Sequence, residues 1–292
     1  NALAEAAESD ARRAAGKTLG PLDGIPYTAK DNYMVKGLTV AAGSPAFTEL
    51  IAQRDAFIIE RLRAAGAICL GLTNMPPMAN GGMQRGAYGR AESPYNEKFL
   101  TAPFASGSSN GSGTATTSSF AAFGLGTETW SSGRGPATNN SLCAYTPTIG
   151  VISVRGMFPL VPTQDVVVPH TRTMADMFEI LNVLVADDTE HRGDFWRAQP
   201  WIKLPAPSQV RPADYTTLNV NDSQATSMLA GKKFGVPKMY INKDPQQVTG
   251  DGQGMGGSTG QKIVTRQSII DAWEKTRAQL EALGAQIIEV DF

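Results

Sequence analysis

Two serine-rich segments hold the residues whose types and spacing could do chemistry. The segment "GTETWSSGRGPA" (126–137) contains the adjacent serines Ser131 and Ser132, and "ASGSSNGSG" (105–113) precedes it. A serine hydroxyl becomes a nucleophile when a neighbouring base takes its proton, so serines of a reactive site need a base, whereas serines of a linker do not. The base that the chain could supply therefore decides between these two interpretations.

The surroundings of the serines argue against a linker. No charged residue occurs between Phe99 and Thr127, and Gly, Ser, Thr and Ala dominate that stretch. A solvated linker of this length usually carries charge, whereas small uncharged residues let backbones approach one another in a packed interior. Because buried hydroxyls must find hydrogen-bond partners, we predict a buried, hydrogen-bonded segment.

Histidine and lysine are the candidate bases. The chain has two histidines: His191 lies in the polar stretch "DDTEHRGD", which is typical of a solvated loop, and His170 follows "VVVP", where a packed residue at a strand end is expected. A Ser–His–Asp triad would have to use one of them, and neither context favours it. Lys30 in "LDGIPYTAKDNY" is the other candidate. Burial can lower a lysine pKa from ~10.4 to about 7–8 at a cost on the order of 4 kcal/mol. A lysine before an aspartate is more commonly a surface residue, so both interpretations of Lys30 stay open here.

Three segments together resemble a known family. "GPLDGIPYTAKDN" (20–32), "SGSSNGS" (106–112) and "GTETWSSGRGP" (126–136) are similar, in that order, to the three signature blocks of the amidase signature family. That family hydrolyses amide bonds with a Ser–cis-Ser–Lys triad. The resemblance implies that Lys30 is the base, that Ser108 is the bridging serine with a cis peptide before it, and that Ser132 is the nucleophile. The 24 residues from Ser108 to Ser132 match the family's interval.

The resemblance also implies a mechanism and an oxyanion hole. Neutral Lys30 would take a proton from Ser108, which relays one from Ser132, so an acyl-enzyme forms without a histidine. The oxyanion-hole and substrate-binding positions that it implies are Thr129, Trp130, Ser131, Ser109 and Gly107. No metal and no cofactor is expected, and the sequence has no CxxC or HxxxH spacing typical of a zinc site.

Some residues depart from the family pattern. They are Trp130-Ser131 in place of Gly-Gly, Glu128 in place of Asp, and Ser106 and Asn110 in place of glycines. If the family glycines need a positive φ, Trp130 would be strained at its position. Ser131 also competes with Ser132 as the nucleophile, although the register to Arg134 and Pro136 favours Ser132. The Trp130 indole is expected either to form a flat wall for an aryl substrate or to pack into the core.

The elements that must position these residues alternate between helices and strands. Helical patterns cover 1–16, 55–66 with Asp55 as the cap, and 268–284 with Ser268 and Asp271 as a capping box. The stretches "AICLGL" (67–72) and "QIIEV" (286–290) are predicted strands that follow a helix and a glycine, which indicates an α/β fold.

The resemblance makes this fold more specific. It implies a single amidase signature domain over 1–292, with a mixed, mostly parallel β-sheet core covered by helices on both faces. Surface loops are expected near 187–227 and 243–262. Family members are longer, so parts before Asn1 and after Phe292 are expected to be absent. The G-x-G-x-x-G at Gly252, Gly254 and Gly257 follows no strand, so a surface loop is expected there rather than a dinucleotide site.

Composition narrows the function classes. With 292 residues, 41% hydrophobic and 18% charged, the chain is typical of a globular protein. With a net charge of −1, the chain lacks the excess of basic residues that is typical of a nucleic-acid binder. It also contains no apolar run of about 18 residues, so a membrane span is not expected. Cys69 and Cys143 are expected to be buried free thiols. We expect a cytoplasmic protein whose partner is a small-molecule amide, with a homodimer left open.

Three functions compete at this point. The first is an amidase that hydrolyses a linear carboxamide through an acyl-enzyme. The second is a glutamine-dependent amidotransferase subunit, which the same family includes and which would need partner subunits. The third is a non-catalytic binding protein on the same fold, kept open by Trp130-Ser131.

Overall fold

The computed structural model describes residues 2–80, 85–102, 106–243 and 264–291. Contacts divide the chain into two compact units, Asn1–Asn219 and Val220–Phe292. In the first unit the elements are α1 (Ala2–Ala14), β1 (Pro26–Lys30), η1 (Pro45–Phe47), α2 (Phe57–Ala64), β2 (Ile68–Thr73), η2 (Pro77–Ala79), β3 (Arg85–Gly86), β4 (Gly89–Arg90), α3 (Asn110–Thr117), β5 (Phe123–Glu128), α4 (Arg134–Asn139), β6 (Cys143–Ala144), β7 (Val166–Thr171), α5 (Met174–Leu184), α6 (Phe195–Ala198), α7 (Pro207–Val210) and η3 (Tyr215–Leu218). In the second unit they are α8 (Asp222–Leu229), β8 (Lys233–Pro237), η4 (Lys238–Ile241), α9 (Gln267–Ala282) and β9 (Gln286–Val290).

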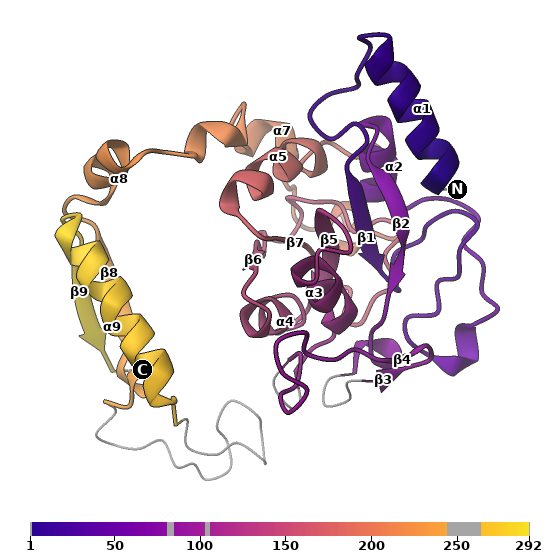
Figure 1. Ribbon diagram of the computed structural model, residues 1–292. Helices are drawn as coiled ribbons and strands as arrows, with labels where there is room; N and C mark the ends of the chain where they lie inside the picture. Colours follow the sequence, from indigo (N-terminus) through magenta and orange to yellow (C-terminus); the bar gives the residue numbers. More distant parts are fainter. Residues whose placement is uncertain (1, 81–84, 103–105, 244–263, 292) are drawn as a thin grey trace. The chain divides into compact units, whose positions relative to one another are not determined.

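A five-stranded sheet forms the centre of the first unit, in the order β2-β1-β5-β7-β6 (Figure 1). Strand β1 pairs in parallel with β2 and β5, and β7 pairs antiparallel with β5 and β6. The predicted α/β class with a mixed sheet is therefore confirmed, although its described pairings are evenly divided between parallel and antiparallel. Every residue of β5 and β7 is buried, as expected for strands in the middle of a covered sheet.

The two faces of the sheet are covered differently. On one face Tyr27 and Phe123 stack with ring centroids 5.4 Å apart, within a core that takes residues from α2 and α5. On the other face α3 packs against β1 and β5. A Cβ on Gly124 would lie 2.5 Å from the Thr116 hydroxyl of α3, so this close approach requires glycine. The predicted close packing of the serine-rich segment is confirmed.

The buried hydroxyls of Ser112 and Thr116 in α3 are hydrogen-bonded, as the sequence predicts. Ser112 Oγ donates to Leu125 O at 2.9 Å and lies 2.8 Å from Thr73 Oγ1. The α3 segment is therefore joined to both β5 and β2 by side-chain hydrogen bonds, which fixes the chain beside Ser108 relative to the end of β1.

The predicted N-terminal caps of two helices are wrong, whereas the glycines predicted to end three helices are confirmed. Asp55 does not cap α2, because its carboxylate accepts the Lys36 N–H and pairs with Arg63. Helix α9 begins at Gln267, so Ser268 and Asp271 lie inside it and form no capping box. Gly16, Gly66 and Gly284 have φ values of 66°, 80° and 87°, the left-handed conformation that ends a helix at glycine.

The second unit contains a parallel pair of strands, β8 and β9, with α9 packed on β9. The predicted strand 286–290 is confirmed there. The expected loop region 187–227 instead contains α6, α7, η3 and part of α8. The expected loop 243–262, with Gly252, Gly254 and Gly257, lies almost entirely outside the described residues. A single domain over 1–292 stays a prediction.

Candidate active site

Lys30 is the last residue of β1, and its side chain is fully buried. Its Nζ donates to Ser108 Oγ at 2.6 Å and to Thr127 Oγ1 at 2.7 Å. Thr127 belongs to β5, the strand beside β1, and Ser108 lies just before α3. The interpretation of Lys30 as a surface residue is therefore wrong, and the structure brings the first two residues of the predicted triad into contact.

Burial lowers the pKa of Lys30 to about 7, because an ammonium loses its hydration in the interior. The carboxylates of Asp165 and Glu128 act in the opposite direction and favour the charged form. A lysine pKa near neutrality leaves a large fraction of the amine unprotonated at neutral pH. The amine is thereby available as a base, which a surface lysine is not.

Gly107 and Ser109 flank Ser108 and fix its position. Gly107 has a φ of 110°, which glycine adopts more readily than any other residue. Ser109 N donates to Ser132 O at 3.1 Å, and Ser109 Oγ bonds to both the N–H and the carbonyl of Thr127. Ser109 therefore ties the Ser108 segment both to β5 and to the serine pair.

The prediction of a cis peptide before Ser108 is wrong for this structure. No described peptide bond is cis, so the Gly107–Ser108 bond is trans. A non-proline peptide favours trans by about 2.5–4 kcal/mol, and the positive φ of Gly107 turns the chain without a cis bond.

Ser132 is buried, and its carbonyl accepts the hydrogen bond from Ser109 N that joins it to the Ser108 segment. Among the described residues no hydrogen bond joins the side chains of Ser108 and Ser132. Ser131 is half-buried, and its Oγ lies 3.0 Å from Ser106 Oγ. The nucleophile role of Ser132 and the binding roles of Thr129, Trp130, Ser131, Ser109 and Gly107 stay predictions.

The turn from β5 to α4 is held by the Glu128 carboxylate. Its Oε2 accepts the N–H groups of Gly133 at 3.0 Å and Arg134 at 2.7 Å, and its Oε1 accepts the Arg134 Nε. In the described part of the chain, the N–H groups of Trp130, Ser131 and Ser132 donate to no acceptor. The turn therefore leaves free donors of the kind an oxyanion hole uses.

Trp130 replaces a family glycine without left-handed strain. Neither Trp130 nor Ser131 is among the non-glycine residues with positive φ, so the expected strain is absent. The Trp130 side chain is 65% exposed, which excludes packing of the indole into the core. Its carbonyl accepts a hydrogen bond from Arg134. Contact of the indole with a substrate stays a prediction.

The two histidines lie where the sequence predicts. His191 is exposed. His170 is fully buried in β7, and its Nε2 lies 3.0 Å from Gly133 O, next to Ser132. Burial lowers the pKa of His170 to about 4, and the charge of Lys30 adds to this effect. A neutral imidazole there supports the turn after the serine pair.

Thr127 and Asp165 are site residues that the sequence reasoning missed. Thr127 shares the Lys30 amine with Ser108, and Asp165 accepts a hydrogen bond from the Thr129 hydroxyl. The position of Thr127 beside Glu128 in the third signature block was an available signal. Asp165 lies outside the three blocks, so only the fold identifies it.

Metal-binding clusters and membrane-spanning helices are both absent from the described residues. These residues contain no group of three or more His, Cys, Asp or Glu side chains placed to hold a metal ion. They also contain no helix that combines the length and the apolar character needed to cross a membrane. Cys69 is a buried free thiol as predicted, whereas Cys143 is free but half-buried.

The chain matches known proteins over most of its length. The family model described as Amidase matches residues 1–226. The A subunit of glutamyl-tRNA(Gln) amidotransferase from Bordetella avium is 30% identical over 289 residues, covering 99% of this chain and 51% of that protein. The protein of the same name from Methylobacillus flagellatus is 31% identical, covering 99% of this chain and 50% of that protein.

Solved structures give a similar result. The native peptide amidase of Stenotrophomonas maltophilia superposes with a TM-score of 0.75 at 28% identity, covering 99% of this chain and 52% of that one. An amidase family protein from Bacillus anthracis superposes with a TM-score of 0.73 at 27% identity, over 98% of this chain and 50% of that one. The chain thus spans about half the length of the relatives it matches.

Proposed function

Because this chain belongs to the amidase signature family, we propose that the protein hydrolyses the C–N bond of a linear carboxylic amide through a serine acyl-enzyme. The observation that carries the proposal is the buried Lys30 amine, 2.6 Å from Ser108 Oγ, with its pKa lowered to about 7. An amine in this state can accept a proton near neutral pH. Thr127 is its second partner and holds Nζ in place.

The proposed reaction moves one proton along the three residues. The neutral Lys30 amine takes the proton of Ser108, and Ser108 takes the proton of Ser132, whose Oγ bonds to the substrate carbonyl carbon. Collapse of the tetrahedral intermediate breaks the C–N bond, and the amine leaves with the proton returned along the same path. Water then attacks the ester on Ser132 and releases the carboxylic acid. The relay requires the Ser132 side chain to rotate toward Ser108 when substrate binds.

The free N–H groups of Trp130, Ser131 and Ser132 are the proposed oxyanion donors. One such donor stabilises the transition state by roughly 3 kcal/mol in other acyl-transfer enzymes. Because Glu128 occupies the Gly133 and Arg134 N–H groups, it excludes those two as donors and holds the turn in one conformation. The substitution of Gly-Gly by Trp130-Ser131 is compatible with this role, since the donors are backbone groups.

Ammonia release from simple carboxamides tests the proposal. The full chain should release ammonia from acetamide or benzamide, and Ser132→Ala should abolish turnover. Ser131→Ala is the matched control, because the same hydroxyl is removed one position away, and it should retain turnover. A folded Ser132→Ala variant with wild-type turnover, or loss of turnover in Ser131→Ala alone, would contradict the assignment.

A second candidate function is that of a glutamine-dependent amidotransferase subunit. The relatives that are glutamyl-tRNA(Gln) amidotransferase A subunits by name favour it. In that case glutamine would be the amide, and ammonia would pass to a partner subunit rather than to water. The net charge of −1 argues against direct tRNA binding by this chain. Ammonia release from glutamine but not from simple amides, rising when partner subunits are added, would support this second function over the first.

A further inference from the structure

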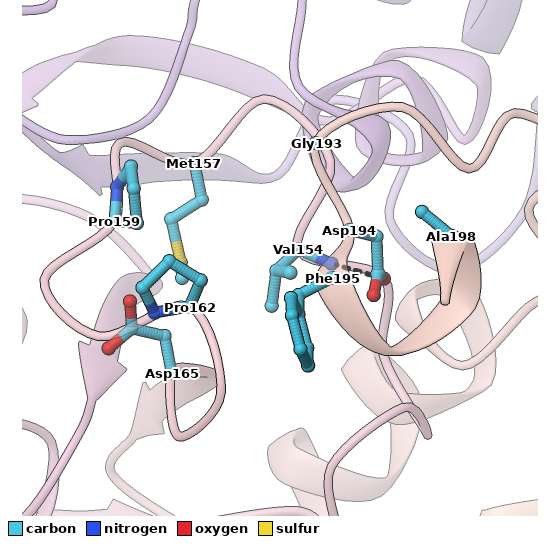
Figure 2. Close-up of a pocket in the computed structure, with 9 residues that line it drawn as sticks. All are labelled: Val154, Met157, Pro159, Pro162, Asp165, Gly193, Asp194, Phe195 and Ala198. Carbon is cyan, nitrogen blue, oxygen red and sulfur yellow. Dashed lines mark hydrogen bonds between the residues drawn. The ribbon is translucent and has the colours of Figure 1, made fainter. Parts of the chain in front are cut away.

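A cavity of about 280 Å³ lies in the first unit, and one of its lining residues, Asp165, is hydrogen-bonded to Thr129 of the candidate site. Figure 2 shows Val154 and Phe195 on one side of it, facing Met157, Pro159 and Pro162 across the opening. Both prolines are exposed, so solvent reaches their side of the cavity. The remaining lining comes mainly from Asp165 and from the segment around α6.

Hydrogen bonds join the walls of this cavity to both halves of the candidate site. Asp165 accepts from the hydroxyl of Thr129, three residues before Ser132. On the other side, Phe158 N donates to Asn32 O at 2.7 Å, and Met157 forms an isolated antiparallel bridge with Tyr33. The cavity wall is therefore bonded both to the turn from β5 to α4, which carries Ser131 and Ser132, and to the chain shortly after Lys30. A ligand in the cavity would therefore lie against a wall that is bonded to Thr129, Asn32 and Tyr33.

The lining selects for uncharged, apolar groups. Asp165 and Asp194 are the charged side chains that line the cavity, and both already have partners. Asp165 accepts the N–H groups of Leu160 and Val161 besides the Thr129 hydroxyl. Asp194 accepts Arg197 N–H and also pairs with the Arg197 guanidinium.

With these carboxylates satisfied, the surface offered to a ligand is a phenyl ring, a thioether, a valine side chain and proline rings. An apolar cavity of about 150 Å³ is known to bind benzene, so the volume here is sufficient for an aryl group. A carboxylate ligand would face two aspartates at close range and would be repelled.

We propose that this cavity is the subsite for an apolar or aromatic substituent on the acyl group of the substrate. This inference rests on the proposed amide hydrolysis. The substituent belongs to the acyl part because Asp165 of the cavity wall bonds Thr129, on the turn whose N–H groups would bind the carbonyl oxygen. The acyl substituent is bonded to that carbonyl carbon and remains with Ser132 after the amine has left. Benzamide is thus a better fit than acetamide or an acidic acyl group.

Two variants of the cavity wall test the proposal against a distant control. Val154→Trp fills the cavity and Phe195→Ala removes its ring, whereas Ala7→Trp adds the same bulk at an exposed position of α1. Both wall variants should lower the ratio of kcat/KM for benzamide to kcat/KM for acetamide about tenfold or more, the usual range for changes in an apolar pocket. Ala7→Trp should leave the ratio unchanged.

Binding without turnover separates this inference from the proposed function. In a Ser132→Ala background, calorimetry should show benzamide binding that Val154→Trp weakens about tenfold or more. This binding can be measured even if the wild-type chain hydrolyses no amide. Binding without hydrolysis would refute the proposed function and leave the subsite standing. If the wild type hydrolyses amides and both wall variants keep the benzamide to acetamide ratio, the subsite is refuted and the function stands. N-Benzylacetamide carries its ring on the amine part. If the wall variants lower kcat/KM for N-benzylacetamide but not for benzamide, the assignment of the cavity to the acyl part is refuted.

Discussion

Replacing Lys30 by methionine should change how the stability of the protein depends on pH. Lys30 has a pKa of about 7 in the folded chain against an ordinary value of 10.5. Above pH 10.5 neither state carries the proton, so the lysine imposes no ionisation cost on folding. As pH falls towards 7, the unfolded chain binds a proton that the folded chain does not, and the free energy of unfolding decreases. Below pH 7 the cost is fully present and constant.

The magnitude follows from the size of the shift. Between the two pKa values the free energy of unfolding changes by up to about 1.4 kcal/mol per pH unit. Over roughly pH 7 to 10 this amounts to about 3–4 kcal/mol. Lys30→Met removes the titrating group and keeps a similar volume. It also leaves Ser108 and Thr127 without their amine partner, at a cost of about 1–3 kcal/mol that does not depend on pH.

Urea unfolding followed by tryptophan fluorescence at several pH values between about 6 and 10 measures this effect. The difference in unfolding free energy, wild type minus Lys30→Met, should rise by about 3–4 kcal/mol from roughly pH 7 to pH 10. Lys36→Met is the matched control, because this exposed lysine lies outside the buried site. Parallel curves for wild type and Lys30→Met over this range would show that Lys30 titrates normally and would refute a neutral buried amine.

The pH dependence of turnover and variants at Glu128, Trp130 and the two histidines test the same geometry. The kcat/KM for amide hydrolysis should rise with pH around 7 and then level off, because Lys30 is active once it has lost its proton; a rate that falls over this range would contradict the base assignment. Glu128→Gln should lower kcat at least roughly tenfold with a smaller effect on KM, since the carboxylate holds the serine turn; unchanged kinetics would refute this role. Trp130→Gly should alter the unfolding free energy by less than about 1 kcal/mol, because the indole is mostly exposed, while benzamide becomes a poorer substrate relative to bulkier acyl groups; an unchanged substrate ranking would show that the indole does not contact the substrate. His170→Ala and His191→Ala should both retain acyl-enzyme formation, and complete loss of it in either folded variant would point to a different triad.

The sequence predicts the parts of the site that depend on local motifs. Helix ends at Gly16, Gly66 and Gly284 could be predicted because a left-handed residue is a local requirement that glycine meets at low cost. The packing of the serine-rich segment was also predictable from its lack of charge. The contact between Lys30 and Ser108 was predicted from the family resemblance, and the structure shows this contact.

The remaining parts depend on contacts between distant segments. Asp55 is a good cap by type, but its carboxylate bonds instead to Lys36 N and Arg63. The contact between Lys30 and Thr127 spans 97 residues and exists because β5 pairs with β1. The cavity that Asp165 lines is built from a loop and α6, neither of which carries a recognisable motif. No local rule on residue types identifies such neighbours before the fold is known.

The most direct test of the central claim is to locate the serine that reacts as the nucleophile. The full chain is treated with a fluorophosphonate probe, digested, and analysed by mass spectrometry to find the modified residue. We predict modification of Ser132, retained in Ser131→Ala and strongly slowed in Lys30→Met, because in the proposed relay the Lys30 amine, bonded to Ser108, activates Ser132. Modification of Ser131 in the wild-type chain, or undiminished modification of Ser132 in Lys30→Met, would contradict the account.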